Sequence, residues 1–365
     1  MPKKQTIDKQ LIFLIFALLG FGLSALYSAS TVESFDSFGN TTHYIFHQLL
    51  YGAGLGLVAM VILSKVDYHK WQKLLPIIVL VSLVLLALVK APGIGFSAGG
   101  ATRWIHFGPI FFQPAELAKL AIILYLAAWA SKKNYSEENF IFGVLPSLII
   151  VGLFALLILW QPDFGTMSIL IGIAAVMLFA SGMSFKHFAY LGLIGAIVLL
   201  LLVKFEPYRY QRVVSFLNPQ TDTLGSSYQI NQALLGIGAG QFWGYGYGLS
   251  RQKYNYLPEP MGDSIFAITA EELGFVRILI PLLLFMLFAL KGRSIAKSAP
   301  DTFGRMAALG ITSWIALQAL LNISSMVGLL PLTGVPLPFF SYGSSALLIN
   351  LAAMGILLNI SRQSK

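Results

Sequence analysis

Residues 141–204, IFGVLPSLIIVGLFALLILWQPDFGTMSILIGIAAVMLFASGMSFKHFAYLGLIGAIVLLLLVK, decide the fold class of this chain. The segment contains three apolar stretches, at residues 141–159, 166–182 and 188–204, which are separated by short polar turns. The hydrocarbon core of a bilayer is about 30 Å thick, and a helix of roughly 20 residues crosses it. The segment therefore predicts three consecutive transmembrane helices.

Seven further stretches of similar length lie outward from this segment, at residues 11–30, 44–63, 75–91, 114–131, 265–290, 304–326 and 343–360. Of the 365 residues, 57% are hydrophobic and 11% are charged, which excludes a water-soluble globular protein. Lipid cannot satisfy backbone hydrogen bonds, so apolar segments of this length span as helices. We expect an all-α polytopic membrane protein with ten transmembrane helices, forming one domain over residues 1–365.

The positive charges predict the orientation, because the cytoplasmic loops of membrane proteins retain Lys and Arg. With the N-terminus inside, the inner segments hold 15 of the 24 Lys and Arg residues: Lys3, Lys4, Lys9, Lys65, Lys70, Lys73, Lys132, Lys133, Lys186, Lys291, Arg293, Lys297, Arg305, Arg362 and Lys365. Both termini are then cytoplasmic. The net charge of +9 is mostly this bias, so it favours contact with anionic lipid headgroups and not with nucleic acid.

Two segments interrupt the hydropathy pattern. Residues 205–264 form a long outer loop, long enough to be functional, in which Ile230, Ala233, Leu234 and Ile237 have the spacing of a short interfacial helix. The glycine-rich run GIGAGQFWGYGYG that follows suits a tight turn or close approach to a ligand, or is simply a bent interfacial loop. The second segment, GLLPLTGVPLPFFSYGSS before the last span, is non-helical and must face protein or a water-filled cavity.

Ionisable residues near the ends of spans are costly in lipid and therefore need an explanation. Glu116 and Lys119, in PAELAK, lie three residues apart on one helix face, either as a structural ion pair or as part of a site. Asp163, in WQPDFGT, either caps the sixth span or serves the same site. Glu271, Glu272 and Arg277 most simply hold the bundle together.

Asp263 is the candidate catalytic residue. It lies at the outer mouth of the eighth span in YLPEPMGDSIFAI, where its carboxylate can face a cavity below the long loop. Partial desolvation raises the pKa of a carboxyl group and makes it a suitable general base. The alternative is a helix N-cap.

Cationic residues gather on the same outer side: Arg103, Arg209, Arg212, Arg251 and Lys253. Such groups bind phosphates well, although they can also anchor the protein to lipid headgroups. Trp104 and Trp243 either stack on sugar rings or belong to the aromatic belt. The chain contains no cysteine, which excludes disulfides and cysteine catalysis, and its five histidines show no zinc-binding spacing.

Four motifs, in order along the chain, resemble those of the SEDS family (shape, elongation, division and sporulation): RWIHFGPIFFQPAELAK, WQPDFGT, SRQKYNYLPEPMGDSIFAITAEELGF and GVPLPFFSYGSSALL. The resemblance covers essentially the whole chain. SRQKYNYLPEP is more similar to the division branch, FtsW, than to the elongation branch, RodA. Two details depart from the family pattern: Gly262 and Ser264 flank the acid in place of the common threonine and phenylalanine, and Ser344 replaces a glycine.

The resemblance implies a peptidoglycan glycosyltransferase that polymerises lipid II, an undecaprenyl-diphosphate-linked disaccharide pentapeptide, with inversion. It implies that Asp263 deprotonates the acceptor 4-hydroxyl group and that Arg103 and Trp104 are functional. It further places Glu116, Lys119 and Asp163 in a central cavity. On these grounds we expect Lys119, Arg103 and Arg251, with Lys253 beside them, to bind the diphosphate.

The resemblance also implies a location and partners. We expect a bacterial cytoplasmic (inner) membrane protein with an extracytoplasmic active site and a role in cell division or elongation. The expected partners are a class B penicillin-binding protein and other division or elongation proteins. A divalent cation, Mg²⁺ or Mn²⁺, is expected to assist, but no ligand set is evident in the sequence, and no organic cofactor is expected.

Two other classes of protein fit the hydropathy. A lipid II flippase or transporter would also have ten spans, broken helices and intramembrane charges, but its main acids should lie near the midplane. A non-catalytic scaffold would activate a transpeptidase and would not need Asp263. The outer position of Asp263 and of the cations favours the enzyme.

Overall fold

The computed structural model describes residues 8–98, 101–108, 110–132, 144–205, 207–217 and 226–364. The helices are α1 (Lys9–Phe38), α2 (His43–His47), the π-helix η1 (Gln48–Gly54), α3 (Leu55–Lys65), α4 (His69–Leu88), α5 (Pro114–Ala130), α6 (Leu145–Trp160), α7 (Phe164–Ala180), α8 (Phe185–Phe205), α9 (Pro207–Leu217), α10 (Ser226–Ala239), α11 (Ile265–Ser298), α12 (Thr302–Met326) and α13 (Ser344–Gln363). The strands are β1 (Gly95–Ala98), β2 (Ala101–Phe107) and β3 (Ile110–Phe112).

The all-α membrane architecture is confirmed. Seven of the described helices or helix runs are long and apolar enough to cross a membrane: α1, α2 to α3 as one run, α4, α8, α11, α12 and α13. The helices α5, α6 and α7 coincide with the other three expected stretches. They contain only 16 or 17 residues each, so they are shorter than a typical membrane-spanning helix. The exact number of crossings therefore stays a prediction.

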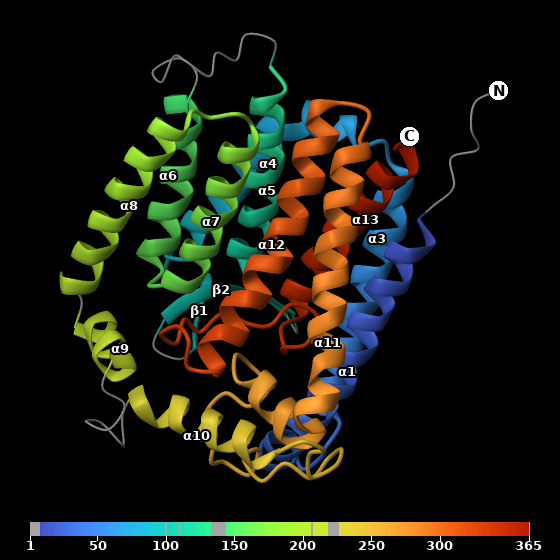
Figure 1. Ribbon diagram of the computed structural model, residues 1–365, viewed down its shortest axis with the longest axis vertical. Coiled ribbons are helices and arrows are strands. Elements are labelled where there is room, and N and C mark those ends of the chain that lie inside the picture. The colour runs from blue at the N-terminus through green and yellow to red at the C-terminus, as the bar shows by residue number, and fades with distance from the viewer. Residues whose placement is uncertain are drawn as a thin grey trace.

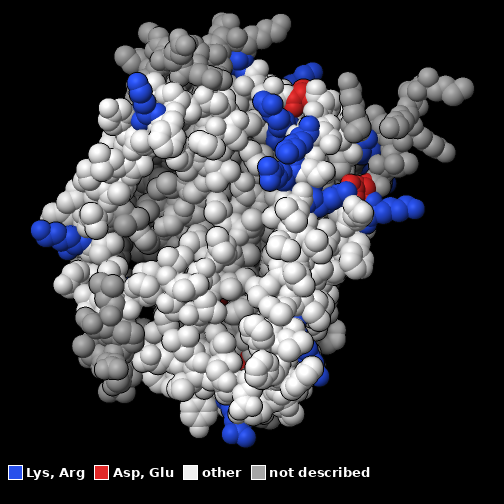
Figure 2. All heavy atoms as spheres, in the orientation of Figure 1, with Lys and Arg blue, Asp and Glu red and all other residues white. Residues whose placement is uncertain are grey.

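The helices form an upright bundle whose two ends differ (Figure 1). The first described residues and the end of α13 lie at one end, where Lys and Arg gather on the visible surface (Figure 2). The other end carries the small sheet, α9, α10 and the segment that leads into α11. This separation of charge is the one that the sequence predicts for a cytoplasmic and an outer end.

The bundle is tightest around α13, which is almost entirely buried. Glycines let α13 and α3 approach closely: a β-carbon on Gly56 would lie 2.7 Å from the side chain of Leu351, and one on Gly355 would lie 2.6 Å from the carbonyl oxygen of Met60. By contrast, α8 is largely exposed, and an apolar cavity of about 560 Å³ lies between it and α6.

The long outer loop is more ordered than the sequence indicates. The expected interfacial helix is present as α10, which lies across the end of the bundle (Figure 1). Helix α9 and the antiparallel sheet β1–β2–β3 before α5 were not predicted from the sequence. These elements are short, and strand pairing depends on contacts that hydropathy does not report.

The glycine-rich run fills a break in α11. Gly274 has φ 73° and ψ 174°, which interrupts the helix. Four backbone hydrogen bonds bridge the break: Phe275 N to Gln241 O (2.7 Å), Val276 N to Phe242 O (3.1 Å), Tyr245 N to Glu271 O (3.1 Å) and Gly246 N to Glu272 O (3.0 Å). A β-carbon on Gly244 would lie 2.1 Å from Glu272 O, so the glycine lets the run pack directly against the backbone of α11. Close approach of this run to a ligand stays a prediction.

Candidate active site at Asp263

Asp263 lies between the outer loop and α11, on a backbone that three groups hold. Asn322 of α12 donates a hydrogen bond from Nδ2 to the carbonyl oxygen of Asp263 (2.7 Å). Ser341 donates from Oγ to Gly262 O (2.6 Å), and the Tyr342 backbone N–H donates to Met261 O (2.8 Å). The position of Asp263 is therefore set by α12 and by the irregular segment before α13.

The carboxylate of Asp263 has few partners. Gln229 of α10 donates from Nε2 to Oδ1 (3.1 Å) and also to the hydroxyl of Ser264 (3.0 Å). The hydroxyl of Ser264 lies 3.5 Å from the same oxygen, Oδ1. Ser264, and not Asp263, occupies the N-cap position of α11, and neither side chain caps the helix. The N-cap interpretation of Asp263 is thus excluded.

Desolvation and, as a smaller cause, the nearby charge of Glu259 raise the pKa of Asp263 to about 6. The guanidinium of Arg212 and the hydrogen bond from Gln229 act in the opposite direction. A carboxyl group with this pKa is mostly ionised at neutral pH and is more basic than an ordinary aspartate. These are the properties of a general base.

The irregular segment between α12 and α13 is fixed by side chains that satisfy its carbonyl oxygens. Gln318 donates from Nε2 to Pro336 O (2.9 Å), and Asn322 donates from Nδ2 to Val335 O (2.8 Å). Arg212 of α9 donates from Nη1 to Leu332 O (2.7 Å). The expectation that this non-helical backbone faces protein is confirmed.

Glu116 and Lys119 form a buried ion pair in the centre of the bundle. Lys119 Nζ lies 2.9 Å from Glu116 Oε1 and 2.8 Å from Gln318 Oε1, and it lies over the ring of Trp314. Because Gln318 and Asn322 lie one turn apart on α12, the pair is connected to the backbone of Asp263 through one helix face. The other oxygen of Glu116, Oε2, is buried without a hydrogen-bond partner.

Asp163 caps α7. Its carboxylate accepts hydrogen bonds from the backbone N–H of Thr166 (3.0 Å), the hydroxyl of Thr166 (2.8 Å) and Nε2 of Gln113 (3.3 Å). Capping therefore accounts for this acid, while Gln113 links it to the start of α5.

Arg103 and Trp104 lie on β2. The guanidinium of Arg103 donates to the carbonyl oxygens of Gln161 and Pro162, so it ties the sheet to the turn between α6 and α7. Trp104 is paired with Phe96 of β1 and is half-buried. Neither residue has a hydrogen bond to Asp263 among the contacts of the described residues.

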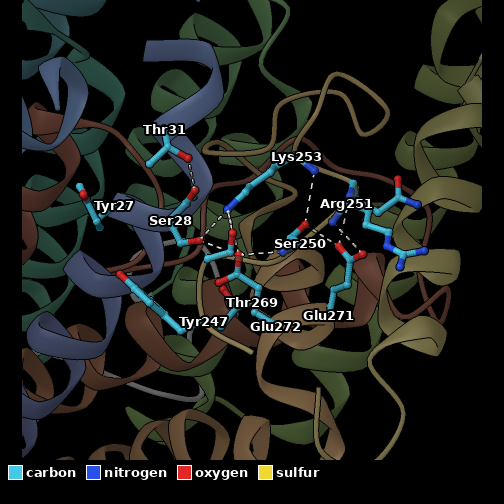
Figure 3. Close-up of polar contacts among 12 residues, drawn as sticks. Tyr27, Ser28, Thr31, Tyr247, Ser250, Arg251, Lys253, Thr269, Glu271 and Glu272 are labelled. Carbon is cyan, nitrogen blue, oxygen red and sulfur yellow. Dashed lines mark hydrogen bonds and ion pairs between the residues drawn. The ribbon is translucent and has the colours of Figure 1, made fainter. Parts of the chain in front are cut away.

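Lys253 does not face Asp263 but belongs to a buried cluster with Glu271 and Glu272 (Figure 3). Its Nζ lies 2.7 Å from Gly248 O, 3.2 Å from Ser28 Oγ and 3.3 Å from Glu272 Oε1. Glu271 accepts from the backbone N–H of Arg251 (3.0 Å). These contacts confirm a structural role for the two glutamates, but Arg277 is exposed and takes no part.

The side chain of Arg251 is exposed, and its guanidinium lies 5.0 Å from the centre of the Tyr245 ring. Sequence reasoning missed the neutral groups that hold Asp263, namely Gln229, Asn322 and Ser341. The available signal was the pair of carboxamide side chains, Gln318 and Asn322, one helical turn apart in a membrane span. Within the parts of the chain that the structure describes, no three His, Asp or Glu side chains converge as a metal site would need, so no catalytic step is assigned to a metal.

Comparisons with known proteins identify relatives that match the whole length of the chain. The chain is 43% identical over 363 residues to stage V sporulation protein E of Bacillus subtilis (strain 168), covering 100% of this chain and 99% of that protein. It is 37% identical to a probable peptidoglycan glycosyltransferase FtsW of Geobacter sp. (strain M18), covering 100% and 99% of the two chains.

Two solved structures have the same fold. A chain from a peptidoglycan synthase complex that coordinates polymerization and crosslinking matches with a TM-score of 0.80 and 28% identity, over 98% of both chains. The rod shape determining protein RodA of Thermus thermophilus matches with a TM-score of 0.72 and 27% identity, over 98% of both chains. Since the family model of the FtsW, RodA and SpoVE cell cycle proteins also matches residues 9–365, the chain belongs to this family of multi-pass membrane proteins.

Proposed function

We propose that this protein is a peptidoglycan glycosyltransferase that polymerises lipid II at the outer face of the bacterial cytoplasmic membrane. The observation that carries the proposal is the carboxylate of Asp263, which has a raised pKa and is held by neutral groups at the end of the bundle opposite the termini. The relative named as a probable peptidoglycan glycosyltransferase FtsW supports the reaction type.

In the proposed reaction, Asp263 accepts the proton of the acceptor sugar's 4-hydroxyl group. The oxygen then forms a bond to C1 of the donor sugar, while the bond from C1 to the diphosphate oxygen breaks and its electron pair leaves with undecaprenyl diphosphate. Attack from the side opposite the leaving group inverts the configuration at C1. A positioned general base contributes about 10²- to 10⁴-fold to the rate of such a step.

The placements of the cations rank them as candidate ligands of the diphosphate. Arg251 is exposed at the outer end, so it is the strongest of the predicted contacts. Arg103 is partly exposed and could turn from its two carbonyl partners to a phosphate. Lys119 and Lys253 are buried in ion pairs, which supports a structural role, and the diphosphate would have to displace a carboxylate to reach either of them.

A class B penicillin-binding protein is the proposed partner, since one structural relative is part of a complex that couples polymerization to crosslinking. The similarity to FtsW and to a sporulation protein supports a role in the division branch of the family and not in the elongation branch. Lys and Arg cluster at the end of the bundle that carries the first described residues and the end of α13, which supports a cytoplasmic location of both termini (Figure 2).

The test is polymerisation of labelled lipid II by the purified protein with its transpeptidase partner. The assay contains Mg²⁺ or Mn²⁺, because the family resemblance implies a divalent cation. We expect glycan polymer from the wild type and none from Asp263→Ala, with complex formation and lipid II binding retained. Equal polymer from both would remove Asp263 as the base. No polymer from either, with binding intact, would favour the transporter or the scaffold.

A further inference from the structure

The guanidinium of Arg212 and the carboxylate of Asp263 both border the space beside Gly334. Gly334 has φ +67° and lies in the irregular segment before α13. A β-carbon at this position would have two heavy atoms within 4 Å: Arg212 Nη1 and Asp263 Oδ2, each at 3.9 Å. The missing side chain therefore leaves an opening that a guanidinium and a carboxylate face from α9 and from the start of α11.

Both groups are held in place from outside this space. Arg212 is anchored by its hydrogen bond to Leu332 O (2.7 Å), two residues before Gly334. Gln229 binds the other carboxylate oxygen of Asp263, Oδ1, so Oδ2 is the oxygen directed at the opening. Oδ2 of Asp263 thus faces the opening as a hydrogen-bond acceptor, and Nη1 of Arg212 faces it as a cationic nitrogen.

We propose that this opening binds the acceptor hydroxyl group of the substrate, which donates a hydrogen bond to Oδ2 of Asp263 and accepts one from Arg212. A hydroxyl group is both donor and acceptor, as this pair requires, whereas a phosphate would be repelled by the carboxylate. The proposal rests on the glycosyltransferase function and adds a substrate position and a further residue to it.

Arg212 then acts on the charge that develops during the reaction. As the hydroxyl proton moves to Oδ2 of Asp263, negative charge appears on the attacking oxygen until its bond to C1 forms and the diphosphate departs with the electron pair. A guanidinium is always protonated, so it stabilises that charge at any working pH. It also favours the ionised form of Asp263, opposite to the effect of Glu259.

Among the described residues, Arg212 and Glu259 are the charged groups that act on Asp263. Arg212 approaches from α9, and Glu259 lies on the same loop as Asp263. The other packed elements contribute neutral side chains, Gln229 from α10 and Asn322 from α12. Loss of the Arg212 charge should therefore shift the pH midpoint of the reaction, whereas a general loss of structure should lower the rate without shifting the midpoint.

A first experiment compares Gly334→Ala with Gly328→Ala in the lipid II assay. Both glycines have positive φ, +67° and +75°, so both substitutions strain the same segment. A β-carbon on Gly328 would meet only apolar side chains, with Leu234 nearest at 3.6 Å. We expect Gly334→Ala to lose polymerisation by about tenfold or more, as removal of one stabilising contact does, and Gly328→Ala to retain most of it. Equal activity of the two variants would overturn the proposal.

A second experiment measures kcat/KM against pH for Arg212→Lys and Arg212→Gln. Removing the cation should lower the rate by about 10²-fold and move the midpoint to higher pH, because the ionised form of Asp263 loses a favourable charge. Arg212→Lys should keep the wild-type midpoint and part of the rate. A uniform loss without a shift would mean that Arg212 only holds α9 in place.

The failure of this proposal is distinguishable from that of the proposed function. If Asp263→Ala is inactive while Arg212→Gln and Gly334→Ala match the wild type, the acceptor position is overturned and the enzyme remains. If Asp263→Ala polymerises like the wild type, the base and the acceptor position are overturned together.

Discussion

Asp263 and the pair Glu271 and Glu272 lie close together in the sequence, but their carboxylates have opposite environments. Glu271 accepts hydrogen bonds from Ser250 and from the backbone N–H groups of Arg251 and Gln252, and Glu272 accepts from Ser28, Ser250 and Lys253 (Figure 3). Asp263 accepts one strong side-chain bond, from Gln229.

The difference shows that one stretch of chain contains both carboxylates with a structural role, Glu271 and Glu272, and the candidate base, Asp263. Several donors converge on Glu271 and Glu272, so these two carboxylates hold together the segments that carry the donors. A carboxylate with one neutral donor and an open oxygen keeps its basicity. The crowded pair fixes the outer loop to α11, and the sparsely bonded acid at the end of that loop is left for chemistry.

Asp263→Asn should have the largest effect, because it removes the basic oxygen and preserves shape. We expect polymerisation to fall by about 10²- to 10⁴-fold. The folded-state pKa is raised, to about 6, so the ionised acid is disfavoured in the fold at pH 7 and the amide should raise Tm slightly. Gel analysis of glycan products and thermal unfolding in detergent test both points. An active Asn variant would erase the distinction between the two regions.

Lys253→Met should act on stability and not on chemistry. It leaves Glu272 buried without its cation, a loss that typically costs about 3–5 kcal/mol. Thermal unfolding of the purified protein in detergent measures this effect, and the double variant with Glu272→Gln should recover most of it. If the single variant keeps its stability but loses lipid II binding, Lys253 is a substrate ligand after all.

Gly274→Ala should release the outer loop from α11. A β-carbon there would lie 2.2 Å from the backbone nitrogen of Gly244, and φ is +73°. Strain of this kind costs about 1–3 kcal/mol. Hydrogen exchange of the amides of residues 245 and 246 should quicken. Gly238→Ala is the matched control, since nothing lies within 4 Å of its β-carbon position; equal exchange in both variants would contradict the bracing role of this contact.

The smallest effect concerns pH. A base with a pKa of about 6 must be deprotonated to act, so kcat/KM should rise with pH up to about 6 and level off above it. Glu259→Gln removes a charge that raises the pKa of Asp263, so the midpoint should move to lower pH. Glu271→Gln should leave the midpoint unchanged. A profile without an inflection near pH 6 in the wild type would count against Asp263 as the titrating group.

The helical spans and the place of Asp263 could be predicted because both depend on local sequence. Apolar runs of membrane length report helices directly, and the prolines before Asp263 mark the start of a span. The ion pair of Glu116 and Lys119 was also predictable, since its members are one helical turn apart.

The environment of Lys253 could not be predicted, because its partners are distant in sequence. Ser28 is 225 residues away, on α1, and Glu272 approaches only once the loop has folded back onto α11. The break at Gly274 could not be predicted for the same reason. In the sequence Gly274 resembles any other glycine in a span, and the break forms because a backbone segment some thirty residues earlier hydrogen-bonds there. Hydropathy and spacing do not encode such pairings.

The backbone of Asp263 is held by residues that follow it in the chain, namely Asn322, Ser341 and Tyr342. All three supports are synthesised after the whole of α11, which ends at Ser298. An unfinished chain therefore carries the carboxylate without the geometry that makes it useful. A chain truncated before residue 322 lacks all three of these supports.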